Sequence, residues 1–508
     1  MRLSADVVIV GSGPGGAVMA KELSEIAGLS IILVDAGPYV LERYYQQLEL
    51  KMTELFWERG NRVTDDLSTQ ILQARCVGGG TVVYTGTAHK VPDFVLNDWA
   101  GRWRVEGFTR GDLDAGYERV ASNMFITEHT EEDWNDNNRL FVEACTGNNI
   151  GVENLKRFVD KCIGCGFCYQ GCKYRRKVTM LNTYLPKAFA NGVQLISNFH
   201  VNEVLYDPKT KRASGVKGVV KPTPPLAERN SVPEGSLEIN ARLVVMAAGA
   251  INTPSILLRS KSLPDLGAAL GRFVLMQNAH NVHILMPYKV SMIRGIPKAA
   301  STKEFLDSHR FVIAPAQNHP IATANDVTGF GLNWKHLMRY FHNLLQWQVI
   351  CGDDPHFTNY VYLDSTGKTN VRYLYSPDYI ERQIAGLRTC ARLAFSIGAE
   401  RVFLGPTKNG YVTNRNMNAL DHHIHRKYFS PGRFSLTTAH PQGGCRMGGN
   451  PKHSIVNSNG RAHRINGLIV SDASIFPSPT HVNPVYTILA ATTLIALRTK
   501  EDIDKLLE

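Results

Sequence analysis

Short apolar runs separated by glycine turns give the first picture of this chain. Residues 7–10 are continuously apolar and lead into a glycine-rich turn at 11–16, and an alanine-rich stretch with helical spacing runs from 17 to 26. A second apolar run, at 30–34, ends at Asp35. Continuous apolar runs are typical of strands buried on both faces, so the pattern predicts a β-α-β unit within a parallel sheet.

Two later segments repeat the combination of strand and turn. Residues 242–258 predict a buried strand, a tight turn and the start of a helix. We place that start at Thr253-Pro254, because Thr can cap a helix and Pro fits its first turn. Residues 468–477 predict another strand that ends at an acid, Asp472.

The middle of the chain carries weaker signals. Residues 370–375 predict a short strand, 376–377 a turn, and the stretch up to about Ser396 an amphipathic helix. The length of 508 residues favours two or three domains. The hydrophobic content of 44% and the charged content of 20% are ordinary for a soluble globular protein. These features together predict an α/β protein with a large core.

Charge adds little to this picture. The net charge of +11 is spread along the chain, with one local cluster at Lys173, Arg175, Arg176 and Lys177. We expect this cluster to be a solvated basic face; the alternative is a surface that docks an acidic electron-transfer partner or attracts an anionic substrate. Nothing resembles a nucleic-acid-binding module, and no apolar run reaches the 18 residues of a transmembrane span.

The expected location is the cytoplasm. No apolar signal segment precedes the strand-like run at 7–10, and five of the nine cysteines are scattered, as is typical of a reducing compartment. Export together with a partner subunit that carries the signal is left open.

The first β-α-β unit carries a dinucleotide-binding fingerprint. Gly11, Gly13 and Gly16 would let the backbone close on a pyrophosphate at the helix N-terminus. Asp35 is placed to bind ribose hydroxyls. A second glycine cradle runs from Arg75 to Thr81, and its candidate cofactor contacts are Arg75, Gly78, Gly79 and Thr81. These motifs alone do not decide between NAD and FAD.

Four cysteines stand in one short run. Cys162, Cys165, Cys168 and Cys172 have the spacing C-x2-C-x2-C-x3-C, which bacterial ferredoxins use to hold iron–sulfur clusters. The run favours one-electron chemistry beside a nucleotide cofactor. A zinc site, disulfides or reduced thiols are the alternatives. Lys173 stands where a Pro normally follows the fourth cysteine, so three or four ligands are both open.

Together these segments resemble the glucose–methanol–choline family of FAD oxidoreductases, at residues 7–37, 75–92, 242–260 and 433–498. The resemblance implies an α/β fold in which a discontinuous Rossmann-like FAD-binding domain is joined to an α+β substrate domain with an antiparallel sheet. The FAD-binding domain would comprise 1–90, 191–280 and 431–508. The substrate domain would comprise 91–190, with the cysteine segment 162–172, and 281–430.

The chain departs from the family pattern at three points. Asp35 stands where the family often has Glu, and Tyr84 stands where it commonly has Asn. Val82 and Val83 occupy the region in which some relatives link the flavin covalently through a His, so the resemblance implies non-covalent FAD. Further cofactor contacts implied by the family are Val201, Ala248, Asp472, Ala473 and Pro484.

The resemblance also implies the catalytic pair. His440 stands in a segment similar to the family's H-P-x-G-G-C motif, and Asn483, followed by Pro, fits the branch of the family with Asn at the second position. His440 would accept the hydroxyl proton of an alcohol, or orient the hydroxyl while a water carries the proton. Asn483 would donate to the developing alkoxide. His481 is a further candidate, for lining the pocket or capping a turn.

The leading hypothesis is an FAD-dependent alcohol or sugar dehydrogenase. Some sugar dehydrogenases of the family hold an iron–sulfur cluster in the region of the cysteine run, so a 3Fe-4S or 4Fe-4S cluster would pass electrons to an acceptor protein or partner subunit. Long-chain alcohol oxidases carry a similar cysteine string, which makes an oxygen-using oxidase the alternative. A non-catalytic redox-sensing flavoprotein is the third possibility. No motif identifies the alcohol.

Overall fold

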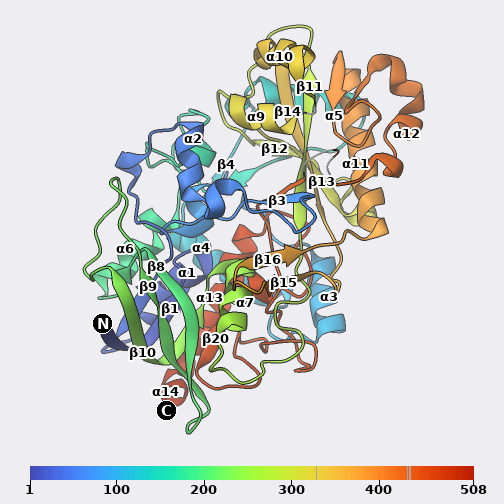
Figure 1. Cartoon of the computed structure of the whole chain (residues 1–508). Helices are drawn as coiled ribbons and strands as arrows, with labels where there is room; N and C mark the ends of the chain where they lie inside the picture. The colour runs from blue at the N-terminus through green and yellow to red at the C-terminus, as the bar shows by residue number, and fades with distance from the viewer. Residues whose placement is uncertain (328, 432, 434–435) are drawn as a thin grey trace.

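The computed structural model describes residues 1–327, 329–431, 433 and 436–508. Two seven-stranded sheets organise it, one in the lower half of Figure 1 and one in the upper half. Both chain termini lie beside the lower sheet. The strand order of this first sheet is β7 (Gln194–Ile196), β2 (Ile31–Val34), β1 (Arg2–Val10), β10 (Gly235–Met246), β9 (Arg212–Val220) and β8 (Phe199–Asp207), and β20 (Leu468–Val470) also pairs with β10.

The predicted β-α-β unit forms the centre of the first sheet. β1 pairs in parallel with β2 and with β10, and the residues at 7–10 are all buried. The strand begins earlier than predicted, at Arg2, and helix α1 spans Pro14–Leu23, rather than starting at residue 17. The helix starts early because Pro14 fits its first position directly after the glycine turn.

Helices cover this sheet and bury one continuous core. α1 packs against α13 (Val485–Glu501), which in turn packs against α4 (Arg110–Asn123), and α6 (Tyr184–Ala190) also contacts α1. The apolar residues of these helices join those of the strands in the largest hydrophobic cluster. α4 therefore belongs to the core of the first sheet, although its residues fall in the predicted substrate segment 91–190.

The second sheet is mainly antiparallel, and α11 and α5 pack against it. The predicted helix ending near Ser396 is confirmed as α11 (Pro377–Ser396), which Ser376 caps by accepting from the Tyr379 N–H. The strand order is β13 (Phe311–Pro315), β14 (Leu344–Gly352), β11 (Gln277–Leu285), β17 (Arg401–Phe403) and β18 (Tyr411–Thr413), with β19 (Leu436–Thr438) bridging β11 and β3 (Thr69–Ile71).

The connection between the two sheets lies at β19. This strand and β3 come from segments assigned by sequence to the FAD-binding domain, yet both add to the second sheet. β11 begins at Gln277 and crosses the predicted border at residue 280. The second sheet therefore draws strands from both predicted domains, and β19 carries the chain directly to His440.

Shorter elements complete the fold. Two-stranded ladders join β12 to β5, β15 to β16 and β4 to β6. β16 is shorter than the strand predicted at 370–375. The bounds are β4 (Thr127–Glu128), β5 (Glu153–Asn154), β6 (Lys156–Arg157), β12 (Ala300–Ser301), β15 (Tyr360–Leu363), β16 (Thr369–Arg372), α2 (Glu49–Met52), α3 (Asp93–Trp103), α5 (Asp136–Gly147), α7 (Gly249–Arg259), α8 (Leu306–His309), α9 (Pro320–Asp326), α10 (Gly331–Arg339), α12 (Leu420–His423) and α14 (Ile503–Leu507).

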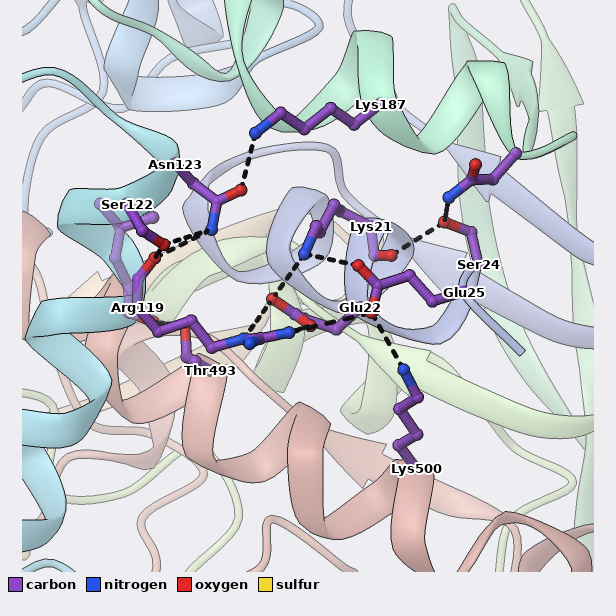
Figure 2. Close-up of polar contacts among 12 residues, drawn as sticks. Lys21, Glu22, Ser24, Glu25, Arg119, Ser122, Asn123, Lys187, Thr493 and Lys500 are labelled. Atoms are coloured by element: carbon purple, nitrogen blue, oxygen red, sulfur yellow. Dashed lines mark hydrogen bonds and ion pairs between the residues drawn. The ribbon is translucent and has the colours of Figure 1, made fainter.

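A buried carboxylate links the helices of the first layer. Glu22 on α1 is 0% exposed, and Arg119 on α4 donates to its two oxygens at 3.0 and 2.6 Å. Lys21 lies 3.2 Å from the same carboxylate and 2.7 Å from Glu25, which also pairs with Lys500 on α13 at 2.9 Å (Figure 2). Because a buried carboxylate is costly without partners, this network fixes how α1 and α4 pack.

We predict that Arg119→Ala destabilises the fold by about 3 kcal/mol, because it strips Glu22 of its two guanidinium hydrogen bonds. Lys500→Ala is the matched control: its pair with Glu25 is partly exposed, so the expected loss is below about 1 kcal/mol. Urea unfolding measures both. Equal losses in the two variants would contradict the importance of the buried pair.

Candidate functional site

One cavity of about 700 Å³ brings together the predicted catalytic pair and most of the predicted cofactor contacts. It is bounded by the first turn of α1, by β2, by the second glycine cradle and by the second sheet. The predicted residues that line it are Gly11, Gly13, Asp35, Arg75, Gly79, Val201, Ala248, Asp472, Ala473 and Pro484, together with His440 and Asn483.

Three predicted cofactor contacts do not line this cavity but support its wall from behind. A Cβ on Gly16 would lie 1.7 Å from the Gly11 carbonyl oxygen, so this glycine allows α1 to pack closely on the strand. Gly78 has a φ of +92° and donates its N–H to the Ser12 hydroxyl at 3.0 Å. Thr81 donates its hydroxyl to the Gly78 carbonyl at 2.7 Å. The cofactor contacts predicted for these three residues stay predictions, and the contacts seen here show that each residue also supports the cavity wall.

The Asp35 carboxylate is held rigidly at the end of β2. Its Oδ2 accepts from the N–H and the hydroxyl of Ser12 at 2.9 and 2.6 Å, and its Oδ1 accepts from the Gly37 N–H at 2.8 Å. Burial raises the pKa of this carboxyl, while these hydrogen bonds oppose the shift. Oδ1 keeps capacity for a further donor, as contact with a ribose hydroxyl requires.

Asp472 holds the opposite wall. Its Oδ2 accepts from the Gly249 N–H at 2.8 Å and from the Thr253 hydroxyl at 2.6 Å, and its Oδ1 accepts from the Ser474 N–H at 2.7 Å. Helix α7, which follows β10, starts at Gly249, whose N–H is the one bound by Asp472. The sequence had suggested a start at Thr253-Pro254. Gly249 takes a φ of +86°, which sets the turn, and Pro254 lies inside the helix.

The chemistry of this wall fits a dinucleotide cofactor. The two glycine cradles face each other so closely that a Cβ on Gly79 would lie 2.6 Å from the Cα of Gly13. The N-terminus of α1, which attracts anions, opens at this point. Arg75 lines the same cavity with a buried Nε that has no hydrogen-bond partner among the described residues. Unused donors around a glycine-lined gap suit a pyrophosphate.

His440 and Asn483 meet at the other end of the cavity. Asn483 Nδ2 lies 3.2 Å from His440 Nε2, and the His440 N–H donates to the Thr438 hydroxyl at 3.1 Å. Burial, with a contribution from the charge of Lys298, lowers the pKa of His440 to about 3. The imidazole is therefore neutral at neutral pH and can accept a proton.

His481 is placed differently from this pair. It is buried with a φ of +56°, its ring lies 5.5 Å from that of Phe94, and it does not line the cavity. The structure thus favours a packing role for His481 in the turn before Asn483.

Sequence reasoning missed a group of polar residues in the cavity wall. Asn281 on β11 and Gln348 on β14 are cross-strand neighbours, and Lys298 lies beside them. No motif marks these residues. The available signal was the presence of amide side chains in both strands, at Gln277, Asn278 and Asn281 on β11 and at Gln346 and Gln348 on β14.

The four cysteines of the run line a second void of about 10 Å³, room for about one water molecule. All nine cysteines are free thiols, so the disulfide alternative is wrong for this structure. In the part of the chain that the structure describes, no group of three or more His, Cys, Asp or Glu side chains could hold a metal ion. The predicted metal site at Cys162, Cys165, Cys168 and Cys172 therefore stays a prediction.

The surroundings of the cysteine loop are cationic. Arg157 donates to the Cys168 sulfur at 3.5 Å, and Lys177 donates to the Cys168 carbonyl at 2.5 Å. Of the predicted solvated cluster, Lys177 is buried, while Lys173, Arg175 and Arg176 are exposed. Tyr169 and Gln170, next along the loop, line the large cavity, so the two cavities share this wall.

We predict that Gly13→Ala weakens FAD binding at least tenfold, about 1.4 kcal/mol, while the apoprotein still folds. The only atom near an added Cβ is the Gly79 Cα at 3.7 Å, so the protein alone has space for the methyl group. That space is where a pyrophosphate would approach. Gly101→Ala, on α3 with no atom within 4 Å, is the control. Titration of the apoprotein with FAD checks both, and unchanged affinity in Gly13→Ala would contradict the assignment.

Comparison with known proteins places the chain in a family. The GMC oxidoreductase models match residues 29–270 and 355–492. An uncharacterized GMC-type oxidoreductase of Mycobacterium tuberculosis is 28% identical over 97% of this chain and 76% of its own length. A long-chain-alcohol oxidase of Arabidopsis thaliana, FAO4A, is 25% identical over 99% of this chain and 70% of its own length.

Solved structures show the same fold. Pyridoxine 4-oxidase from Mesorbium loti superposes with a TM-score of 0.70 at 17% identity, covering 97% of this chain and 99% of its own. Formate oxidase from Aspergillus oryzae RIB40 gives a TM-score of 0.73 at 13% identity, covering 99% of both chains. Among the described residues, no helix is both long and apolar enough to cross a bilayer. Because the family models match well over half of its residues, the chain belongs to the GMC oxidoreductase family, whose members bind FAD.

Proposed function

We propose that this protein oxidises an alcohol or sugar hydroxyl to a carbonyl with non-covalently bound FAD. The observation that carries the proposal is the contact of His440 with Asn483 at 3.2 Å, in the same cavity as the two glycine cradles. A sensor without catalysis would need no such pair, which argues against the third hypothesis.

FAD would be held by the cradles around Gly13 and Gly79, with Asp35 toward the ribose and Arg75 toward the pyrophosphate. When bound, FAD supplies the acceptor for the hydride that leaves the alcohol carbon. Positions 82 and 83 hold Val82 and Val83 where some relatives have the His that links the flavin, which supports non-covalent binding.

His440 and Asn483 would divide the work on the hydroxyl. The Asn483 amide donates toward His440 Nε2 in this structure, so that nitrogen is an acceptor and can take the hydroxyl proton. Asn483 would turn its donor to the substrate oxygen as negative charge develops there. A positioned base contributes roughly 10²–10⁴-fold and one such donor about 10²–10³-fold to the rate.

For the route by which electrons leave, we propose an iron–sulfur cluster. Cys162, Cys165, Cys168 and Cys172 would hold it as a 3Fe-4S or 4Fe-4S cluster and it would supply one-electron transfer. The donor type fits, since four thiols line one void and Arg157 and Lys177 contact Cys168. Burial raises the pKa of Cys162 and Cys165, so binding of the cluster must displace their protons. The void is smaller than a cluster, so the sulfurs must spread as the cluster binds.

We also propose an electron-acceptor partner and a cytoplasmic location. The exposed side chains Lys173, Arg175 and Arg176 lie next to the cysteines and would receive an acidic acceptor protein or partner subunit. Nine free thiols are typical of the reducing cytoplasm, which is the location we propose.

The second candidate is an oxidase that uses oxygen. It is favoured by the comparisons, because FAO4A and both solved structures are described as oxidases. In that case the alcohol and oxygen give a carbonyl compound and hydrogen peroxide, and the cysteines are structural.

We predict that His440→Ala slows anaerobic flavin reduction by about 10³-fold, because it removes the base. Asn483→Ala should slow it by about 10²-fold through loss of the donor. His481→Asn is the control: Asn tolerates the positive φ of this position, and the rate should stay within about threefold. Stopped-flow absorbance of the FAD-loaded variants against a panel of alcohols measures this, and an unchanged rate in His440→Ala would overturn the assignment.

We predict that anaerobically purified protein contains three or four iron atoms per chain with matching acid-labile sulfide. Cys165→Ser should lower both contents, whereas Cys145→Ala, which changes a buried cysteine outside the run, should not. Iron and sulfide analysis decides the matter. Protein with flavin but no iron, together with peroxide formation in air, would establish the oxidase instead.

A further inference from the structure

Lys298 is a buried cation that the proposed chemistry does not use. It follows β11 in the chain, is 2% exposed and lines the large cavity. Its ammonium donates to the Gln348 Oε1 at 3.0 Å. Within the described part of the chain, no Asp or Glu forms an ion pair with it. A buried charge is costly unless it is paired, so a cation left with one neutral amide needs an explanation.

The amide partner is oriented by a chain of hydrogen bonds. Gln348 Nε2 donates to Asn281 Oδ1 at 2.8 Å, and Asn281 Nδ2 donates to Asp326 Oδ2 at 2.7 Å. The same Asp326 oxygen accepts from Asn318 at 2.5 Å. A carboxylate can only accept, so Asp326 draws the amide nitrogens of Asn281 and Asn318 toward itself. Asn281 then presents its oxygen to Gln348 Nε2, which leaves the Gln348 oxygen facing Lys298.

This chain positions Lys298 without neutralising it. Asp326 is separated from the ammonium by two side chains, and its Oδ2 accepts from two amides and lies 3.5 Å from His283 Nε2. Among the residues that the structure describes, the ammonium uses one of its three donors, toward Gln348. The other two remain for a ligand in the cavity that Lys298 lines.

Lys298 lies on the substrate side, near the catalytic pair. Its partners Asn281 and Gln348 face the cavity from the second sheet, whereas the cofactor cradles come from the first. Ala279 on β11 pairs with Thr437 on β19, the strand that leads to His440. The charge of Lys298 also contributes to the lowered pKa of His440, which requires that the two lie near one another.

We propose that Lys298 binds a carboxylate on the substrate, so that the enzyme oxidises a hydroxycarboxylate in preference to a neutral alcohol or sugar. One ammonium with two free donors matches one carboxylate. A phosphate carries more charge and is usually met by additional cations. The other cations that line the cavity are Arg62, Arg75 and Arg259. Arg62 pairs with Glu58 at 3.1 Å, and Arg259 donates to the Gly367 carbonyl at 3.3 Å. Arg75 is the residue proposed to face the pyrophosphate. This inference rests on the proposed alcohol oxidation and narrows its substrate.

The proposal implies a pH dependence of binding. Burial, and then the charge of Arg157, lower the pKa of Lys298 to about 7. The nearby His89 and His440 have lowered pKa values and stay neutral near pH 7, and Glu153 pairs with His89 and Lys303. A carboxylate prefers the protonated amine, so its affinity should be highest below pH 7 and fall as the pH rises above it.

The test compares each hydroxycarboxylate with its own methyl ester, using 6-hydroxyhexanoate and 4-(hydroxymethyl)benzoate. Anaerobic flavin reduction in the FAD-loaded enzyme should favour each acid over its ester at least tenfold in rate constant over Kd. Lys298→Met should lower that value for the acids at least tenfold more than for the esters, since any effect through the pKa of His440 is common to both. Lys298→Arg should keep part of the preference. Lys289→Met, an exposed lysine after β11, should behave as the parent protein.

A second measurement needs no turnover. Hexanoate should raise the melting temperature of the FAD-loaded enzyme at pH 6, less so at pH 8.5, and not at all in Lys298→Met, while hexanol serves as the neutral control. Equal reduction by acids and esters would overturn the carboxylate proposal and leave alcohol oxidation intact. If no alcohol reduces the flavin, alcohol oxidation fails, and the hexanoate shift still decides whether Lys298 binds a carboxylate.

Discussion

The turn after β1 passes so close to two other segments that no side chain fits between the backbones. A Cβ on Gly11 would lie 2.3 Å from the Ala247 carbonyl oxygen, and one on Gly15 would lie 1.9 Å from the carbonyl oxygen of Ser471. These contacts bring together the ends of β1, β10 and β20, which are more than 200 residues apart in the chain. Cofactor cradle, sheet register and the start of α7 all depend on this close packing.

Much of the fold could be predicted because its signals are local. The central strands are continuous apolar runs, and α11 shows helical spacing, a Ser cap and a Pro at its start. The start of α7 could not be predicted in the same way. Thr253 caps nothing at its own position; its hydroxyl accepts from the Ala248 N–H at 3.0 Å and donates to Asp472, a contact 219 residues along the chain. Ser376-Pro377 and Thr253-Pro254 both place a hydroxyl residue before a Pro, and both are typical of a helix start. Only the tertiary contacts show that the first pair starts α11 whereas the second lies inside α7.

In the candidate site, too, the residues with local motifs could be predicted and those placed by tertiary contacts could not. His440 and Asn483 were found through motifs that surround each residue, and the structure brings them together. Lys298 has no motif, since its environment is assembled from β11, β14 and α9 by strand pairing and by the carboxylate of Asp326. A lysine reads as exposed in a sequence unless the fold is known, because lysine is almost never buried. The most informative charge in the cavity was therefore the least visible in the sequence.

The cysteine loop forms a further wall of the large cavity. It therefore connects the proposed cluster site with the proposed flavin site. Lys177 donates to the carbonyls of Val82, Tyr84 and Cys168, and so fastens the loop to the second glycine cradle. Burial lowers the pKa of Lys177 to about 8, and thiolates at Cys168 and Cys172 would favour its charged form. Cys168 faces the small void and the adjacent Tyr169 faces the large cavity, so one peptide unit separates the two chambers. A flavin bound against this wall would lie near the cysteines, and an alcohol held by Lys298 would contact the second sheet. The proposed cluster and the proposed substrate site would then be separate parts of the cavity wall.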